Sequence, residues 1–380
     1  MAEFPHVMLR EIYEQPDAIQ RTLDLYVYNT ELNADAFAPM KHWLNSRGEI
    51  LITASGSSRH AGLAAEVIFE DLCCLAVDVE YASEWGARSS ENPRNPSVLV
   101  ISQSGETSDT LDALRLARKR GQQTLAIANV PGSAMLREVG AGMLLAAGPE
   151  LAIPATKSFT CQLTAIYLLA MYIAQQTGVI SAEGIAHCVR DLAQLPAKIV
   201  RQMDDWSIRA RELAKTYVNA STFLYLGRGV HYAIAREGAL KMKESSYMQA
   251  EGYPAGELKH GPNALVEGHV PLVVLATFDR EIEDSIIRYE KTLLLLEDLK
   301  KQRARVIAVA NSGDAHVKEL ASDTLYVQPV GEYLLPIIEV IPLQLFSYFM
   351  AQEHQVDVDH PRNLSKTVIE AAKGISKCGV

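Results

Sequence analysis

The sequence predicts an α/β fold of two tandem doubly wound subdomains, each a parallel sheet in a three-layer αβα arrangement, followed by a carboxyl-terminal tail. An internal repeat is the main observation behind this prediction, because four apolar runs in the first half recur in order in the second. The runs lie at 48–56, 96–102, 124–129 and 142–146, and again at 221–229, 270–276, 306–311 and 323–327. Each run is continuously apolar and helical patterns separate the runs, which is typical of parallel strands buried on both faces.

The repeat divides the chain into five parts. We expect an amino-terminal helical segment at 1–41, a first subdomain at 42–190, a connector at 191–205, a second subdomain at 206–348 and a tail at 349–380. The first segment has an amphipathic pattern, and we expect Glu11, Glu14 and Gln20 on its exposed face.

The composition indicates a soluble protein. Of the 380 residues, 48% are hydrophobic and 22% are charged, and the net charge of -10 gives no basic block to attract nucleic acid. The five cysteines are odd in number and have no CxxC spacing, which favours a reducing, cytoplasmic setting. The amino terminus has no apolar signal core, and the apolar stretch 163–174 is too short to span a membrane.

Two strand-to-helix turns of the first subdomain are rich in hydroxyl groups. They are Ser55-Gly-Ser-Ser58 and Ser102-Gln-Ser-Gly-Glu-Thr107. Helix amino termini with hydroxyl donors suit a phosphate group, and doubly wound sheets bind ligands at the carboxyl ends of their strands. Ordinary helix capping explains one such turn as well, but two at one edge favour phosphate binding. No P-loop or full dinucleotide motif is present.

The helical pattern from Ala233 to about Ala250 carries Glu237, Lys241 and Glu244 on one stripe. A solvated face with a Glu–Lys pair would explain this stripe. The following loop, however, is broken by glycine and proline and holds Glu257, Lys259 and His260 within four residues. Such a loop is typical of an acid–base site.

The segment EGALKMKESSYMQAEGYPAGELKHGP at 237–262 resembles the isomerase-domain signature of the glucosamine-6-phosphate synthase family, whose SIS (sugar isomerase) domains bind phosphosugars. The resemblance implies two SIS subdomains, the first of which binds the phosphosugar. It is strong because the match is long and nearly ungapped.

The resemblance extends to the substrate-binding segments. SQSGET at 102–107 is similar to the family's phosphate loop, which implies Ser102, Gln103, Ser104 and Thr107 as phosphate ligands. SGSS at 55–58 implies Ser57 and Ser58 for the sugar phosphate. Near PATKSFTCQL at 154–163 we expect substrate contacts at Ile153 and at Ala155, where the family has a serine.

The tail segment PRNLSKTVIE resembles a family tail whose lysine forms a Schiff base with the open-chain ketose, which implies Lys366 as that lysine and Ser365 as a neighbouring substrate contact. His260 would open the sugar ring and Glu244 would move a proton between C1 and C2. Lys241 would position the substrate or keep Glu244 ionised. In the family this histidine comes from the neighbouring subunit, so a homodimer is expected, and neither a metal nor another cofactor is implied.

These residues predict an enzyme that interconverts fructose 6-phosphate plus ammonia with glucosamine 6-phosphate. The chain begins Met1-Ala2 and lacks the glutaminase nucleophile, so we expect no glutaminase of its own and a bias toward deamination; a separate glutaminase subunit stays open. A fructosamine-6-phosphate deglycase is the alternative enzyme. A phosphosugar-sensing regulator without turnover is the alternative from another class.

Overall fold

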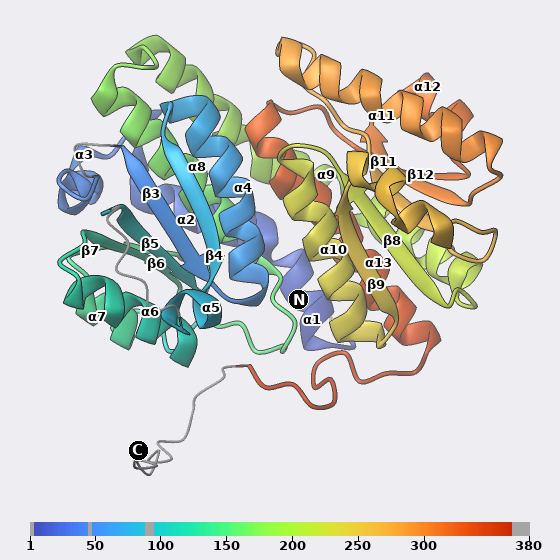
Figure 1. Cartoon of the computed structure of the whole chain (residues 1–380), viewed down its shortest axis with the longest axis horizontal. Helices are drawn as coiled ribbons and strands as arrows, with labels where there is room; N and C mark the ends of the chain where they lie inside the picture. Colours follow the sequence, from blue (N-terminus) through green and yellow to red (C-terminus); the bar gives the residue numbers. More distant parts are fainter. Residues whose placement is uncertain (1–3, 45–47, 88–94, 367–380) are drawn as a thin grey trace.

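The computed structural model describes residues 4–44, 48–87 and 95–366, and these contain two five-stranded parallel sheets (Figure 1). The first sheet has the order β4-β3-β5-β6-β7, and the second has the order β9-β8-β10-β11-β12. The strands of the first are β3 (Glu49–Ala54), β4 (Ala76–Tyr81), β5 (Ser97–Ser102), β6 (Thr124–Ala128) and β7 (Ala141–Leu144). Those of the second are β8 (Thr222–Gly227), β9 (Gln249–Pro254), β10 (Leu272–Leu275), β11 (Val306–Asn311) and β12 (Asp323–Val327).

The two sheets have the same topology, since the first strand of each lies between the second and the third. This reversal of strand order is the switch point at which doubly wound sheets bind ligands. The predicted fold class is therefore confirmed.

One strand of each sheet, β4 and β9, is missing from the sequence prediction. Both are edge strands, pairing only with β3 and β8 respectively. Their sequences, AVDVEY and QAEGYP, contain acidic residues, and the second also contains glycine and proline, so neither resembles the apolar runs of the central strands. The helix expected from Ala233 to Ala250 accordingly ends at Ser246, where Tyr247 takes a left-handed conformation (φ 60°).

Helices enclose both sheets. Those before and around the first sheet are α1 (Val7–Tyr13), α2 (Gln15–Tyr26), α3 (Ala34–Phe37), η1 (Ala38–Met40), α4 (Gly56–Cys73), α5 (Ala82–Ala87), α6 (Ser108–Lys119), α7 (Ala134–Glu138) and α8 (Lys157–Thr177). After α9 (Ala182–Tyr217) follow α10 (His231–Ser246), η2 (Ala255–His260), η3 (Pro262–Leu265), α11 (Glu283–Lys301), α12 (Ala315–Leu320), η4 (Glu332–Leu334) and α13 (Leu335–Glu353). A short hairpin, β1 (Val27–Tyr28) with β2 (Glu31–Leu32), follows α2.

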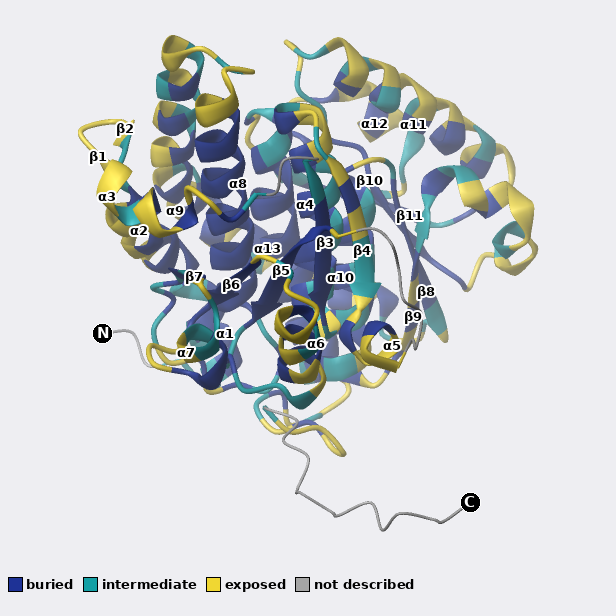
Figure 2. Cartoon of the chain, turned by 60° about the vertical axis from the view of Figure 1, so that its left-hand side comes forward, coloured by how far each residue is buried: buried dark blue, intermediate teal, exposed yellow. Residues whose placement is uncertain are grey.

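The main hydrophobic core lies between the two sheets and joins the subdomains. Helices α8, α13 and α9 contribute more of its buried side chains than any other element, and α4 contacts both α8 and α10 (Figure 2). Smaller cores lie under α11 and under α6, on the outer faces of the sheets. The segment Glu332–Glu353 is apolar and long enough to cross a membrane, but its 18-residue apolar window is fully buried here and is part of this core.

Three further sequence expectations can be compared with the structure. Glu11 is buried, so its expected exposure is wrong: its carboxylate accepts hydrogen bonds from the backbone of residues 151 and 152. The proposed connector 191–205 lies inside the continuous helix α9. Of the proposed tail, residues 367–380 lie outside the described part of the chain.

Candidate active site

The turn after β5 forms a cup of polar groups. Oγ of Ser102 accepts a hydrogen bond from the backbone N–H of Gly105 at 3.1 Å, and Oγ of Ser104 accepts one from the N–H of Glu106 at 3.1 Å. Gly105 has a φ of +65°, and a Cβ there would lie 2.2 Å from Oγ of Ser133, so the turn requires glycine. The side chain of Thr107, the N-cap residue of α6, makes no capping hydrogen bond, and a helix amino terminus of this kind suits an anion.

The turn after β3 leads into α4 beside this cup, because β3 and β5 are paired neighbours. Its two predicted serines already have protein partners. Oγ of Ser58 accepts a hydrogen bond from Nε2 of Gln162 at 2.9 Å, and Oγ of Ser57 accepts one from Nζ of Lys241 at 3.1 Å. The second contact joins the predicted phosphate edge of the first subdomain to the predicted catalytic helix of the second.

The stripe on α10 is buried rather than solvated. Nζ of Lys241 lies 2.5 Å from Oε2 of Glu244 and 3.4 Å from Oε1 of Glu237. The side chains of Lys241 and Glu237 are fully buried, whereas that of Glu244 keeps 22% of its surface exposed. Of the two carboxylates, only that of Glu244 is therefore open to a ligand, and the solvated-face interpretation is wrong.

The charges of this cluster are mutually stabilising. Burial alone would lower the pKa of Lys241, but the carboxylates of Glu237 and Glu244 raise it well above its ordinary value. Burial would raise the pKa of Glu237, but the charge of Lys241 and a hydrogen bond with His60 lower it below its ordinary value. Lys241 is thus a fixed ammonium group, suited to hold an anion or a carboxylate and unsuited to act as a nucleophile.

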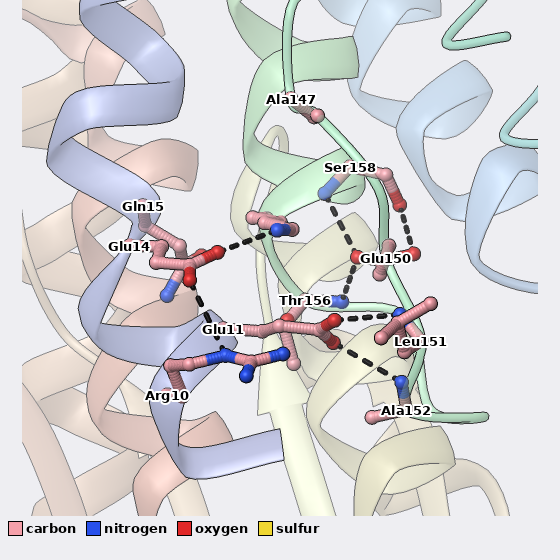
Figure 3. A network of polar contacts seen from close by, with 12 residues as sticks. Arg10, Glu11, Glu14, Gln15, Ala147, Glu150, Leu151, Ala152, Thr156 and Ser158 are labelled. Carbon is pink, nitrogen blue, oxygen red and sulfur yellow. Dashed lines mark hydrogen bonds and ion pairs between the residues drawn. The ribbon is translucent and has the colours of Figure 1, made fainter. Parts of the chain in front are cut away.

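Lys366 lies at a different part of the same region. Its Nζ donates to Oε2 of Glu150 at 2.7 Å and to the carbonyl oxygen of Ala152 at 2.6 Å. Glu150 is buried, and it also accepts hydrogen bonds from the N–H groups of Thr156 and Ser158 and from Oγ of Ser158 (Figure 3). Burial would raise the pKa of Glu150, but Lys366 and these donors lower it below its ordinary value.

Polar contacts along the tail hold it in this position. The carboxylate of Asp359 accepts hydrogen bonds from the N–H groups of Val7 and Met8, at 2.8 and 2.7 Å, and so caps α1. Its carbonyl oxygen accepts the N–H of Ile153 at 3.2 Å. The guanidinium of Arg362 lies 4.3 Å from the ring centroid of Tyr247. The tail is therefore anchored to both subdomains before it reaches Glu150.

Figure 3 shows that Glu11, from α1, and Glu150 approach the same loop. Oε1 of Glu11 accepts the N–H of Leu151 at 2.6 Å, and burial raises the pKa of Glu11 to about 7. Next to it, Lys157 at the start of α8 is paired with Glu14 at 2.5 Å. These acidic groups shape the loop that receives Lys366.

Three sets of contacts, connected through the backbones of α8 and α4, lie between Lys366 and Glu244. Ser158, a partner of Glu150, and Gln162, a partner of Ser58, are one turn apart on α8 and so lie on one face. Ser57 then contacts Lys241, which contacts Glu244. The amino ends of α4 and α8 thus bring the predicted serines, the α10 cluster and the tail lysine to one region.

The remaining predicted site residues are exposed or half-buried. His260 is exposed at the end of η2, and none of the hydrogen bonds or ion pairs recorded for the described residues joins it to Glu244. Ser365 is exposed, and Gln103, Ile153 and Ala155 are half-buried. The described residues contain no group of three or more His, Cys, Asp or Glu side chains arranged for a metal ion.

Three buried residues of this region, His60, Glu150 and Glu11, were not predicted as site residues, and Glu11 was expected on an exposed face. Their partners are far away in the chain, for example 177 positions for His60 and Glu237. A long-range pair of this kind leaves no periodic signal in a single sequence.

A pocket of about 520 Å³ lies at the corresponding loops of the second subdomain, lined by residues 278–282 and 329–334, by α9 side chains, and by Leu72 and Tyr167 from the first subdomain. Its lining mixes cationic Lys198 and Arg280 with acidic Asp191, Asp279 and Glu281. It lacks the hydroxyl-rich turns of the first subdomain. Oγ1 of Thr277, which follows β10, instead donates to the buried Glu339.

Comparison with known proteins identifies the family. The SIS domain model matches residues 44–172 and 216–352. Glutamine–fructose-6-phosphate aminotransferase (isomerizing) of Chlorobaculum tepidum is 40% identical over 96% of this chain, and the match spans 58% of that protein's length. The C-terminal domain of glucosamine-fructose-6-phosphate aminotransferase from Francisella tularensis superposes with a TM-score of 0.86 and 33% identity, over 94% of this chain and 99% of that domain.

A more distant structure, glucosamine-6-phosphate deaminase of Thermotoga maritima, has a TM-score of 0.71 and 20% identity, covers 95% of this chain and 99% of its own, and shows the shared fold. The chain belongs to the SIS domain family, with two SIS domains in tandem that correspond to the carboxyl-terminal domain of the aminotransferases.

Proposed function

We propose that this chain is a phosphosugar enzyme that interconverts fructose 6-phosphate plus ammonia with glucosamine 6-phosphate. The observation that supports this most strongly is the contact of Lys241 with Ser57 on one side and Glu244 on the other. It sets a partly exposed carboxylate beside the turn proposed to hold the sugar phosphate. The names of the relatives, which act on fructose 6-phosphate, support the same substrate.

In the proposed binding mode, the phosphate group lies at the turn of Ser102, Gln103, Ser104 and Thr107, with Ser57 and Ser58 alongside. The open amino termini of α6 and α4 would supply N–H donors to the phosphate. Ile153, Ala155 and Ser365 would contact the sugar from the loop before α8 and from the tail.

In the proposed chemistry, Lys366 loses a proton and adds to the C2 carbonyl of the open-chain ketose, and water leaves as the imine forms. Ammonia then displaces the lysine amine at C2. Glu244 removes a proton from C1 and returns it to C2, while the hydroxyl proton on O1 is transferred through solvent to the imine nitrogen. The product carries an aldehyde at C1 and an amine at C2, which is the 2-amino aldose. Deamination is the same sequence in reverse, and every step balances without another reactant.

The ring-opening acid–base group is proposed to be His260 from a second copy of the chain. Its exposure at the end of η2 leaves it accessible to a second copy, which supports a role across a homodimer interface. The source of ammonia, including a separate glutaminase, and the cytoplasmic location remain predictions.

Ala155 supports one alternative, a fructosamine-6-phosphate deglycase. It lies in the loop before α8 where the synthase family has a serine, so one hydroxyl contact to the sugar is lost. A substrate with a different group at that position would fit without it.

Product analysis tests the proposal. The protein would be incubated with glucosamine 6-phosphate, with fructose 6-phosphate plus ammonium or glutamine, and with a fructosamine 6-phosphate. Conversion between fructose 6-phosphate and glucosamine 6-phosphate with free ammonium supports it. Turnover of the fructosamine 6-phosphate alone would favour the deglycase, and binding without turnover would favour a sensor.

A further inference from the structure

We propose that His60 is a positioning residue that sets the basicity of Glu244 by controlling how Lys241 is shared between two carboxylates. The inference deepens the proposed function, on which its catalytic part rests. His60 is on α4 of the first subdomain, whereas the carboxylates are on α10 of the second.

The contact between His60 and α10 is short and buried. Nδ1 of His60 lies 2.8 Å from Oε2 of Glu237, and the two side chains are 8% and 0% exposed. The pKa of Glu237 is lowered, so it is an ionised carboxylate and can only accept a hydrogen bond. Nδ1 of His60 must therefore carry the proton and donate it to Glu237.

Lys241 stands between Glu237 and Glu244. Its Nζ is 3.4 Å from Oε1 of Glu237 but 2.5 Å from Oε2 of Glu244, so the shorter contact is with the partly exposed carboxylate. Because His60 satisfies the other oxygen of Glu237, the ammonium is free to stay close to Glu244. The ammonium of Lys241 therefore donates a short hydrogen bond to the carboxylate of Glu244, and the position of this ammonium sets the charge beside it.

Few other charged groups bear on this arrangement. The cluster consists of Glu237, Lys241 and Glu244 of α10, and Ser57 and His60 of α4 contact it. Three charged groups on elements packed against α10 have other partners. Arg59 of α4 lies over the ring of Tyr81, Glu339 of α13 pairs with His231, and Glu251 of β9 accepts a hydrogen bond from Tyr253.

Loss of the His60 donor has a defined consequence. Glu237 would keep Lys241 as its main partner, and the ammonium would move toward it and away from Glu244. The pKa of Glu244 would then rise. A purely structural role for His60 predicts lower stability without this change.

The test compares His60→Leu, which removes the donor at similar size, with His60→Asn, whose amide N–H lies close to the position of Nδ1. The pKa of Glu244 would be measured by infrared difference titration of each protein against the same protein carrying Glu244→Gln. The pH dependence of kcat/KM would be measured on the full chain with glucosamine 6-phosphate.

We expect His60→Leu to raise the pKa of Glu244 by about one unit, a tenfold change in proton affinity. The acidic limb of the pH dependence of kcat/KM should move to higher pH by the same amount. His60→Asn should stay close to the parent. Unchanged titration of Glu244 in His60→Leu, or an equal shift in both variants, would overturn the inference. If His60→Leu does not fold, His60→Gln, whose amide lies one bond further out, replaces it in the comparison with His60→Asn.

Failure of the proposed function gives a different result. In that case neither the parent nor the His60 variants turn over either sugar phosphate. The infrared titration still decides whether His60 affects the pKa of Glu244.

Discussion

The ammonium of Lys366 lies 2.7 Å from the carboxylate of Glu150, although 216 positions separate the two residues in the chain. The contact brings the end of the described tail to the loop before α8, beside the serines of the first subdomain. Burial would raise the pKa of Glu150, but Lys366 and the neighbouring donors lower it, so an ionised, buried carboxylate holds the amine of Lys366 as an ion pair. Before an imine can form, the amine of Lys366 must leave Glu150 and give up a proton.

The first prediction concerns the amine of Lys366. Lys366→Ala should abolish trapping of fructose 6-phosphate by borohydride, because no amine remains to form an imine. It should also lower the free energy of unfolding by about 1–3 kcal/mol, since the buried Glu150 loses its counter-ion. Mass spectrometry of the trapped protein and denaturant unfolding measure the two effects.

Lys366→Arg is the matched control. It keeps a cation for Glu150 but has no nucleophilic amine. It should restore most of the stability and none of the trapping. A trapped adduct in either variant would remove Lys366 from the imine step.

The second prediction concerns the proton shuttle. Glu244→Gln should lower kcat by at least about 100-fold, because general base catalysis contributes that much or more, while phosphosugar binding stays within about threefold. Turnover and ligand binding by calorimetry measure the two quantities. Glu251→Gln, an exposed change on the neighbouring β9, should leave both unchanged. Near-parent turnover in Glu244→Gln would exclude it as the shuttle.

The third prediction concerns the phosphate cup. Ser102→Ala removes a hydroxyl that orders the Gly105 N–H and is proposed to face the phosphate, so KM should rise about tenfold, equivalent to about 1.4 kcal/mol. Steady-state kinetics with glucosamine 6-phosphate measure this. Ser312→Ala, in the second subdomain at the end of β11, is the control and should have the parent KM. Equal KM values for all three proteins would contradict the assignment of this turn.

The fourth prediction concerns pH and stability. Burial raises the pKa of Glu11 from 4.5 to about 7, so the folded protein binds this proton more tightly than the unfolded chain. The stability from this group is fully present below pH 4.5 and is lost as the pH rises through 7. Glu11→Gln should therefore remove part of the fall in unfolding free energy between pH 5 and 7, which is at most about 1.4 kcal/mol per pH unit.

Denaturant unfolding at a series of pH values measures this slope for Glu11→Gln. Asp17→Asn, an exposed change in α2, serves as control and should keep the parent slope. If Glu11→Gln also keeps it, Glu11 is ionised in the folded protein throughout this range.

The fold was largely predictable because its central strands are continuous apolar runs repeated in the same order. The edge strands β4 and β9 were not, since their polar residues face solvent and carry no apolar signal. The stripe of Glu237, Lys241 and Glu244 was visible from its spacing, but its burial depends on α4 of the other subdomain.

The buried polar residues that surround the predicted site could not be predicted from sequence. His60, Glu150 and Glu11 are single polar residues within apolar or irregular segments, and their roles come from contacts made only in the folded chain. The expected exposure of Glu11 was wrong for the same reason. Its polar character fits an exposed position, and only the loop at 151–152 gives it buried donors.

The central claim is that the first subdomain holds the sugar phosphate while α10 and the tail act on its carbonyl end. A crystal structure of Glu244→Gln with fructose 6-phosphate tests this most directly. The account predicts the phosphate at the turn of Ser102–Thr107 and C2 within bonding distance of Nζ of Lys366, which has left Glu150. A ligand bound elsewhere, for example in the pocket at 278–282 of the second subdomain, with Lys366 still on Glu150, would contradict it.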